Sequence, residues 1–152
     1  MEVKFRQATI EDKEILLSLE QEVVEAERPY NSDIRENGAH YYDLDDLISS
    51  SQAQLLVGEV EGKIVATGYA QIRSSKTSLV HEKHSYLGFM LVLEEFRGLG
   101  INKLVVDLLV KWSKEQGADY VYLDVYDGND SAVKAYQKVG FEKTLVEMKL
   151  KL

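Results

Sequence analysis

Residues 87 to 112 read LGFMLVLEEFRGLGINKLVVDLLVKW, and they predict the strand, turn and helix around which the rest of the chain is expected to pack. Its first part, from Leu87 to Leu93, is a nearly continuous apolar run bounded by polar residues, which predicts a buried strand. Its last part carries apolar residues at the spacing of one helical face, which predicts an amphipathic helix. That face is predicted to consist of Ile101, Leu104, Val105, Leu108 and Trp112.

The turn between the strand and the helix has the composition of an anion site. Gly98 and Gly100 lack a Cβ where the chain must turn, and a helix N-terminus offers unpaired N–H groups and partial positive charge. Arg97 and Lys103 add formal positive charge. We therefore predict a phosphate cradle, most simply for a pyrophosphate, while a tight turn without a ligand stays open as the alternative. The predicted cradle consists of Arg97, Gly98, Leu99, Gly100, Ile101, Asn102 and Lys103.

Two common phosphate-binding motifs do not match this turn. A P-loop needs Gly-Lys-Ser/Thr at the helix start, whereas Lys103 here lies between Asn102 and Leu104. The dinucleotide fingerprint needs a third glycine where Lys103 stands. An acidic residue, Asp124, does lie near the distance that this fingerprint requires, so the argument against it rests on the missing glycine and on the preceding context.

A second short helix is predicted between Asn129, a capping residue, and Gly140, a stop signal. Asn129 and Tyr136 are seven residues apart and so lie two turns apart on one helical face. The alternative for Tyr136 is an ordinary core aromatic of an amphipathic helix.

Three motifs in this order resemble the GNAT family of N-acetyltransferases. Along the chain they are the opening FRQATIED of residues 5 to 12, R-x-x-G-x-x from Arg97 to Asn102, and N-x-x-A-x-x-x-Y-x-K-x-G-F from Asn129 to Phe141. The resemblance covers nearly the whole chain. In one respect the chain departs from the family, because Asn102 stands where the family's turn usually ends in glycine or alanine. A side chain there crowds the approach to phosphate, although its N–H stays available.

The resemblance implies an α/β (α+β) fold, with a mixed central sheet, helices on both faces and a central parallel pair of strands that splays apart. It implies acetyl-CoA (CoA) as the cofactor, bound in that cleft. Backbone groups of Met90, Leu91 and Val92 would contact it, with the Met90 N–H as oxyanion donor, and Asn129 and Tyr136 would complete the cofactor site. Tyr136 would act as general acid.

Asp124 is the candidate general base, because it lies five residues before Asn129, where ribosomal-protein alanine acetyltransferases of the family carry a glutamate acting as base. Tyr122 and Tyr126 are expected to desolvate it partly and so raise its pKa. A structural hydrogen-bonding role is the alternative. Glu27 and Glu59 are possible substitutes.

The acceptor side is predicted in the irregular segment of residues 28 to 42, which is rich in tyrosine. In family members the corresponding segment shapes the acceptor pocket; a connector packed on the core is the equal alternative. Candidate substrate-binding residues are Glu27, Tyr30, Tyr41 and Tyr42.

Composition agrees with one domain spanning residues 1–152. The chain has 45% hydrophobic residues, no cysteine and a formal charge of −8. The missing cysteines exclude a cysteine acyl-enzyme and favour direct transfer. The acidity argues against nucleic acid as a partner, and the apolar runs are too short for a membrane span. We expect a cytoplasmic enzyme without a metal, because His81-x-x-His84 is an incomplete ligand set.

The expected activity is acetyl transfer from acetyl-CoA to a primary amine of a small molecule or peptide, with a non-catalytic CoA-binding or regulatory domain as the alternative. The remaining segments complete the expected sheet. Strands are predicted over residues 3–7, 53–60, 63–72, 118–126 and 141–152. A helix is predicted from Thr9, its cap, to the residues before Pro29, and a brief helix from Asp43 through Ser49. The exposed final strand makes a homodimer possible.

Overall fold

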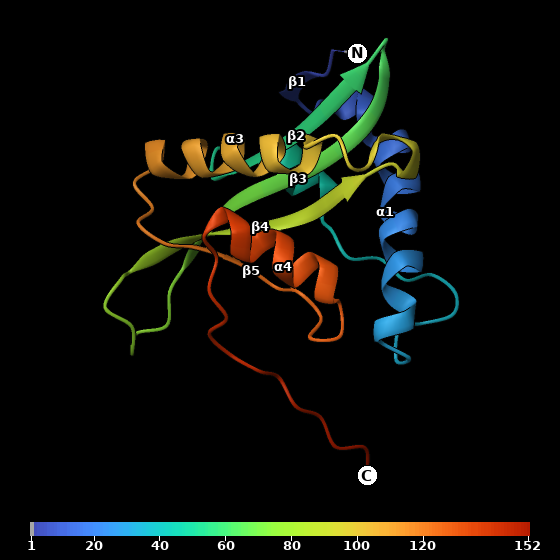
Figure 1. Cartoon of the computed structure of the whole chain (residues 1–152). Helices are drawn as coiled ribbons and strands as arrows, with labels where there is room; N and C mark the ends of the chain where they lie inside the picture. Colours follow the sequence, from blue (N-terminus) through green and yellow to red (C-terminus); the bar gives the residue numbers. More distant parts are fainter. Residues whose placement is uncertain (1) are drawn as a thin grey trace.

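The computed structural model describes residues 2–152, which form a five-stranded sheet and four α-helices (Figure 1). The strands are β1 (Lys4–Gln7), β2 (Ala53–Val60), β3 (Lys63–Ser74), β4 (Lys83–Val92) and β5 (Val121–Leu123). The helices are α1 (Lys13–Glu27), α2 (Leu44–Ser49), α3 (Ile101–Glu115) and α4 (Asp130–Val139), with 3₁₀ turns at Ile10–Asp12, Arg28–Tyr30 and Glu94–Phe96.

The sheet is mixed, with strand order β1-β2-β3-β4-β5. The pairs from β1 to β4 are antiparallel, and β4 and β5 are parallel. Glu61 and Gly62 form the two-residue turn between β2 and β3, and both have positive φ, 50° and 79°, as a hairpin turn of this length requires. The helix α3 connects the parallel pair, which is the crossover that parallel strands need.

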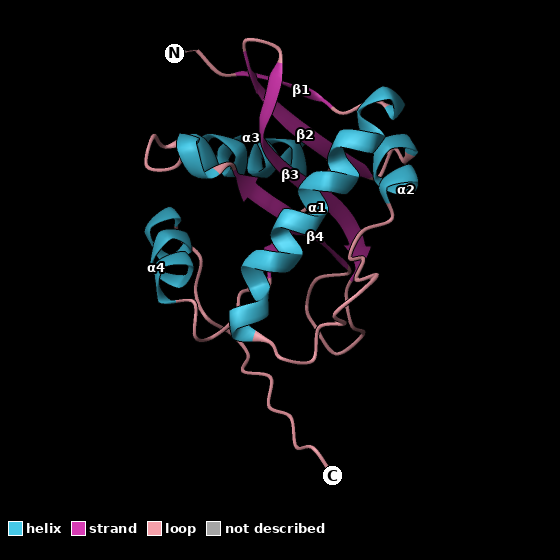
Figure 2. Ribbon diagram, turned by 90° about the vertical axis from the view of Figure 1, so that its right-hand side faces the viewer, coloured by secondary structure: helices cyan, strands magenta, loops and turns pink. Residues whose placement is uncertain are grey.

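Helices cover both faces of the sheet, as predicted. Helix α1 packs on β4 and α2 packs on β2 on one face, while α3 packs on β2, β3 and β4 on the other (Figure 2). In the part of the chain that the structure describes, no helix is long and apolar enough to cross a membrane.

The buried face of α3 differs from the predicted one by a rotation of the helix. Ile101 and Val105 are buried as expected, but Leu104 and Leu108 are exposed. Val106, Leu109 and Ser113 are buried in their place. The predicted spacing of apolar residues in α3 is correct, but the predicted buried face is wrong. A wide apolar stripe allows two neighbouring orientations of the helix, and contact with the sheet selects one of them. Ser113 decides the point: its hydroxyl donates to Ser85 Oγ of β4 at 2.7 Å in the core.

The end of the chain contradicts the prediction of a last strand over residues 141–152. These described residues form neither helix nor strand, and beyond Phe141 the side chains are exposed. The chain leaves the body of the molecule after α4 and runs away from it in both views (Figures 1 and 2). A strand requires a paired neighbour, and none of the strand pairings of the sheet includes this segment. The strand predicted over residues 118–126 is likewise shorter, Val121–Leu123.

Candidate active site

The parallel strands β4 and β5 part after three residues. They pair only from Ser85 to Leu87, opposite Val121 to Leu123, and β4 then continues to Val92 with no strand beside that edge in the described chain. The expected splay of the parallel pair is therefore present. It leaves the stretch that includes Met90, Leu91 and Val92 along an edge where backbone groups are free to meet a ligand.

A β-bulge marks the point where the strands part. Thr67 pairs with Leu91 and Tyr69 with Gly88, so that two residues of β4 oppose one of β3. Phe89 sits in the bulge with φ of 52°, a conformation that is rare for a side-chain-bearing residue. Thr67 Oγ1 donates a buried hydrogen bond of 2.7 Å to the Phe89 carbonyl and so holds the bulge.

The glycine turn before α3 has the geometry of an anion cradle. Gly98 and Gly100 have φ of 79° and 80°, and Gly100 is the N-cap residue, without a side chain to occupy the helix N-terminus. Alternation of left-handed residues turns successive N–H groups toward one point. Arg97 fixes the turn to the end of β4, because its Nε donates to the Val92 carbonyl at 2.9 Å. The turn is exposed from Arg97 to Gly100.

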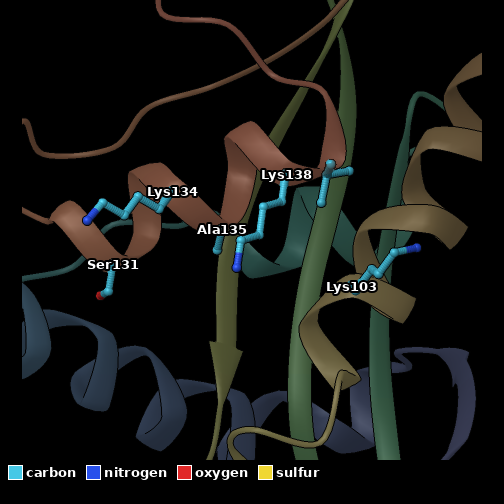
Figure 3. A pocket seen from close by; sticks show the side chains of 6 residues that line it. Lys103, Ser131, Lys134, Ala135 and Lys138 are labelled. Atoms are coloured by element: carbon cyan, nitrogen blue, oxygen red, sulfur yellow. The ribbon is translucent and has the colours of Figure 1, made fainter.

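A cavity of about 440 Å³ opens between α3 and α4, beside this turn (Figure 3). Three of its lining residues are lysines, in a chain with an excess of acidic residues. It is lined by Lys103, Ser131, Lys134, Ala135, Lys138 and Val139. Lys103 is partly neutralised by Asp107 of its own helix, at 2.8 Å, so the lysines of α4 supply most of the unpaired positive charge.

Tyr136 faces the first turn of α3. The Asn102 side chain lies beside its hydroxyl, and burial raises the pKa of the Tyr136 phenol despite this neighbour. The structure thus brings together Asn102, which departs from the family's pattern, and the proposed acid. Asn129 begins α4 as predicted, and its side-chain oxygen accepts the Ala132 N–H at 3.4 Å.

Asp124 lies just beyond β5, where the strands part. Its carboxylate accepts a hydrogen bond of 3.0 Å from the hydroxyl of Tyr86, a residue of β4. The Arg73 guanidinium lies 3.9 Å above the Tyr86 ring. The expected desolvation of Asp124 by its tyrosine neighbours is wrong: Asp124 is exposed, because Tyr122 turns toward His81 and Tyr126 toward Asn31.

The tyrosine-rich segment of residues 28 to 42, here called the connector, packs against the bulge of β4 and against the loop after β5. Tyr42 stacks on Phe89 of the bulge, with ring centroids 4.5 Å apart. Tyr41 lies beside the carboxylate of Glu27, and burial raises the pKa of Glu27 above its ordinary value. Tyr30 stacks on Tyr126 at 6.0 Å and so joins the connector to the loop after β5. The segment therefore both packs on the core and surrounds the parting strands.

Glu20 holds this connector, a role that was not predicted from the sequence. The carboxylate is fully buried on α1. It accepts the backbone N–H groups of Tyr41 and Tyr42 at 2.8 and 2.9 Å and lies 2.9 Å from His40 Nδ1. The available signal was a glutamate within the apolar stripe of α1, next to Leu19, where a solvated charge is not expected.

Two further candidates from the sequence are Glu59, a possible substitute base, and the histidine pair His81 and His84, a possible but incomplete metal site. Glu59 pairs with Arg6 across β1 and β2, two strands away from β4, so it is not a substitute base. His81 and His84 both turn Nδ1 toward Ser75 Oγ, at 2.6 and 2.9 Å. Among residues 2–152 there is no cluster of three or more metal-ligating side chains.

The comparisons with known proteins identify the family. The sequence profile described as the acetyltransferase (GNAT) family matches residues 20–141. The chain therefore belongs to the GNAT acetyltransferases. It is 29% identical over 119 residues to an N-alpha-acetyltransferase of Sulfurisphaera tokodaii, a match that covers 73% of this chain and 69% of that protein. Further curated relatives are matched over less than half of their own length.

Solved structures agree with this fold. A mutant of the BH1408 protein from Bacillus halodurans has a TM-score of 0.87 at 26% identity, over 98% of this chain and 99% of that one. A predicted acetyltransferase from Clostridium acetobutylicum, solved with acetyl-CoA, has a TM-score of 0.78 at 19% identity, over 99% and 96%. The predicted fold class is confirmed.

Replacing Glu20 by alanine is expected to lower the free energy of unfolding by about 3–5 kcal/mol, because two backbone N–H groups would stay buried without an acceptor. Urea unfolding of Glu20→Ala measures this loss. Glu22→Ala is the matched control, because Glu22 is an exposed glutamate of the same helix, and its effect should stay within about 0.5 kcal/mol. Equal stability of the two variants would contradict the role assigned to Glu20.

Proposed function

We propose that residues 1–152 form a single acetyltransferase domain that transfers an acetyl group from acetyl-CoA directly to a primary amine of a small molecule or peptide. The observation that carries this proposal is the parting of β4 and β5 between an exposed glycine turn and Tyr136. The family supports acetyl transfer, and the neighbour solved with acetyl-CoA supports the cosubstrate. The proposal that the acceptor is an amine depends on the carboxylates of Glu27 and Asp124 in the site.

Acetyl-CoA would lie with its pyrophosphate on the N–H groups that open α3, from Gly98 to Lys103. The cavity between α3 and α4 supports this placement, because Lys134 and Lys138 bring positive charge to the side where phosphates would lie. The pantetheine arm would follow the free edge of β4 and pair with Val92, and the Met90 N–H would stabilise the oxyanion. Such a preorganised donor contributes about 10²–10³ in rate.

The reaction needs a neutral amine and a proton for the departing thiolate. An alkyl amine with a pKa near 10 is almost wholly protonated at neutral pH, so a base is required. Asp124 would accept that proton, directly or through water, as the amine attacks the thioester carbonyl and the C–S bond breaks. Tyr136 would then protonate the thiolate sulfur. Its raised pKa keeps the phenol protonated and so able to donate.

Glu27 and the connector tyrosines would form the acceptor wall. Glu27 and Asp124 are linked through two rings. Tyr42 lies near Glu27 and Tyr69 lies near Asp124, since each carboxylate, besides burial, helps to raise the pKa of its neighbouring phenol, and the two rings meet edge-on with centroids 5.9 Å apart. Aromatic rings beside carboxylates suit a cationic amine, which both attract. The cluster thus supports an acceptor that arrives as a cation and loses its proton in the site.

Acetyl-CoA should stabilise the folded chain by about 2.7 kcal/mol at a concentration one hundred times its Kd, because it binds only the native state. Replacing both Lys134 and Lys138 by glutamine should weaken binding about tenfold, since each lysine contributes up to about 1 kcal/mol. Calorimetric titration measures the Kd, and urea unfolding with and without acetyl-CoA measures the stabilisation. Lys111→Gln, an exposed lysine of α3 outside this cavity, should bind as the wild type does. A chain that does not bind acetyl-CoA would contradict the proposal.

Tyr136→Phe should lower kcat for thiol release about a hundredfold and leave the Kd of acetyl-CoA nearly unchanged, because the ring stays and only the proton donor is lost. The assay follows free CoA thiol over a panel of polyamines, amino acids and short peptides. Tyr120→Phe, a tyrosine that lies beside His81, is the control. Binding of acetyl-CoA without thiol release for any amine would favour the non-catalytic alternative.

Substitutions of the two carboxylates, Asp124 and Glu27, should have different kinetic effects. Asp124→Asn should lower kcat about a hundredfold if Asp124 takes the amine proton. Glu27→Gln should mainly raise the KM of the amine. Because burial raises the pKa of Glu27, its charge is lost as pH falls through that raised value, so the wild-type KM should rise toward acid pH and that of Glu27→Gln should not. If Glu27→Gln instead lowers kcat about a hundredfold and Asp124→Asn mainly raises the KM of the amine, Glu27 is the base.

A further inference from the structure

Arg73 brings a cation to the acceptor side of the site, among the tyrosines and carboxylates described above. It belongs to β3, and its side chain is exposed. Its guanidinium stacks on the ring of Tyr86, with 3.9 Å between Cζ and the ring centroid. Its Nε donates a hydrogen bond of 2.9 Å to Gln71 Oε1 of the same strand. The two contacts hold the guanidinium in place, because stacking fixes its plane and the hydrogen bond fixes its direction.

The guanidinium lies close to the point where β4 and β5 part. Burial raises the pKa of the Tyr69 phenol, and the neighbouring Arg73 guanidinium counteracts this increase. The Tyr69 hydroxyl in turn lies against the backbone of Gly88, since a Cβ on Gly88 would be 2.4 Å from that oxygen. Gly88 directly follows Leu87, the last residue of β4 that pairs with β5. Arg73 therefore reaches the opening in which the acceptor is proposed to lie.

Arg73 and Asp124 contact the same tyrosine from two directions. Arg73 covers the ring face of Tyr86, while the Tyr86 hydroxyl donates to Asp124 Oδ2 at 3.0 Å. The cation and the carboxylate are thus separated by the width of one phenol. Within the described residues 2–152, Arg73 forms no ion pair with any carboxylate. Its charge is therefore available to an anion that is not part of the chain.

A guanidinium at this position disfavours an acceptor that is only a cation, because like charges repel and the stacking keeps Arg73 from turning away. An acceptor that also carries a carboxylate removes this repulsion and can accept two parallel hydrogen bonds from the guanidinium. In an α-amino acid a single carbon separates the amine from the carboxylate. The amine can then meet Asp124 while the carboxylate meets Arg73 across the same ring.

We propose that the acceptor is a free α-amino acid, whose carboxylate is bound by Arg73 and whose amine is presented to Asp124. This inference rests on the proposed acetyl transfer and names its substrate class. The bond from the amine nitrogen to the acetyl carbon forms as the thioester C–S bond breaks, which gives an N-acetyl amino acid and free CoA thiol. The ammonium group loses two protons. One passes through Asp124 to solvent, and the other restores Tyr136, which has protonated the thiolate.

Matched acceptors test this assignment. For a panel of amino acids, the thiol-release assay also includes the carboxamide of each and the amine that lacks the carboxyl group. For the best amino acid, kcat/KM should exceed that of both analogues about tenfold to a hundredfold, as expected for charge-assisted hydrogen bonds to a carboxylate. Mass spectrometry of the product should show one acetyl group on the α-nitrogen.

Arg73→Gln separates carboxylate recognition from a structural role. It should raise the KM of the amino acid about tenfold to a hundredfold with kcat little changed. For the amine without a carboxyl group it should leave kcat/KM equal or higher, because the repulsion is gone. Arg73→Lys keeps the charge but loses the planar fork, and should recover part of the preference. The control is Lys76→Gln, which removes an exposed cation from the loop after β3 and should behave as the wild type does.

The results that overturn this inference differ from those that overturn the proposed function. Carboxylate recognition is wrong if the amino acid and its carboxamide react equally well, or if an amino phosphate such as O-phosphoethanolamine reacts better. It is also wrong if Arg73→Gln slows all three acceptors alike, since Arg73 would then only position Tyr86. In each case acetyl transfer still stands. Bound acetyl-CoA without thiol release for any acceptor would overturn the transfer itself, and the amino acid acceptor with it.

Discussion

The bulge at Phe89 is the constraint on which the rest of the site depends. A residue with a large side chain holds a left-handed backbone conformation there, and Thr67 fixes it through a hydrogen bond inside the core. The conformation is unfavourable by itself, so the surrounding packing must maintain it. Its consequence is that β4 changes direction where β5 ends, and the parting strands expose backbone on one side and aromatic side chains on the other.

Charge is divided between the two sides of this opening. The side of α3 and α4 carries the glycine turn and the lysines of the cavity, and it suits phosphates. The opposite side carries Glu27 and Asp124 among tyrosines, and it suits a cation. An overall charge of −8 describes neither environment. The division matches a reaction that joins an anionic donor to a basic acceptor, and it explains why net charge was a poor guide to the ligand.

The connector between α1 and α2 is irregular but not loosely held. Glu20 supplies a buried acceptor for its backbone, and the stack of Tyr30 on Tyr126 joins it to the loop after β5. A fully buried carboxylate is unfavourable unless its lone pairs are satisfied, and here three donors approach it. The connector is therefore held firmly to α1, which suits the acceptor wall proposed for it.

The sequence alone was enough to predict the order of helices and strands as far as α4, the glycine turn and the cap of α4. Each depends on local chemistry, namely apolar periodicity, residues without a Cβ, and capping side chains, and such chemistry is written in neighbouring residues. Only the tertiary structure shows which face of α3 is buried, that Asp124 is exposed, that Glu20 holds the connector, and that residues 141–152 form no strand. Those depend on which surfaces meet across the fold. Leu104 and Val106 are equally apolar, and only contact with the sheet buries one and leaves the other in water.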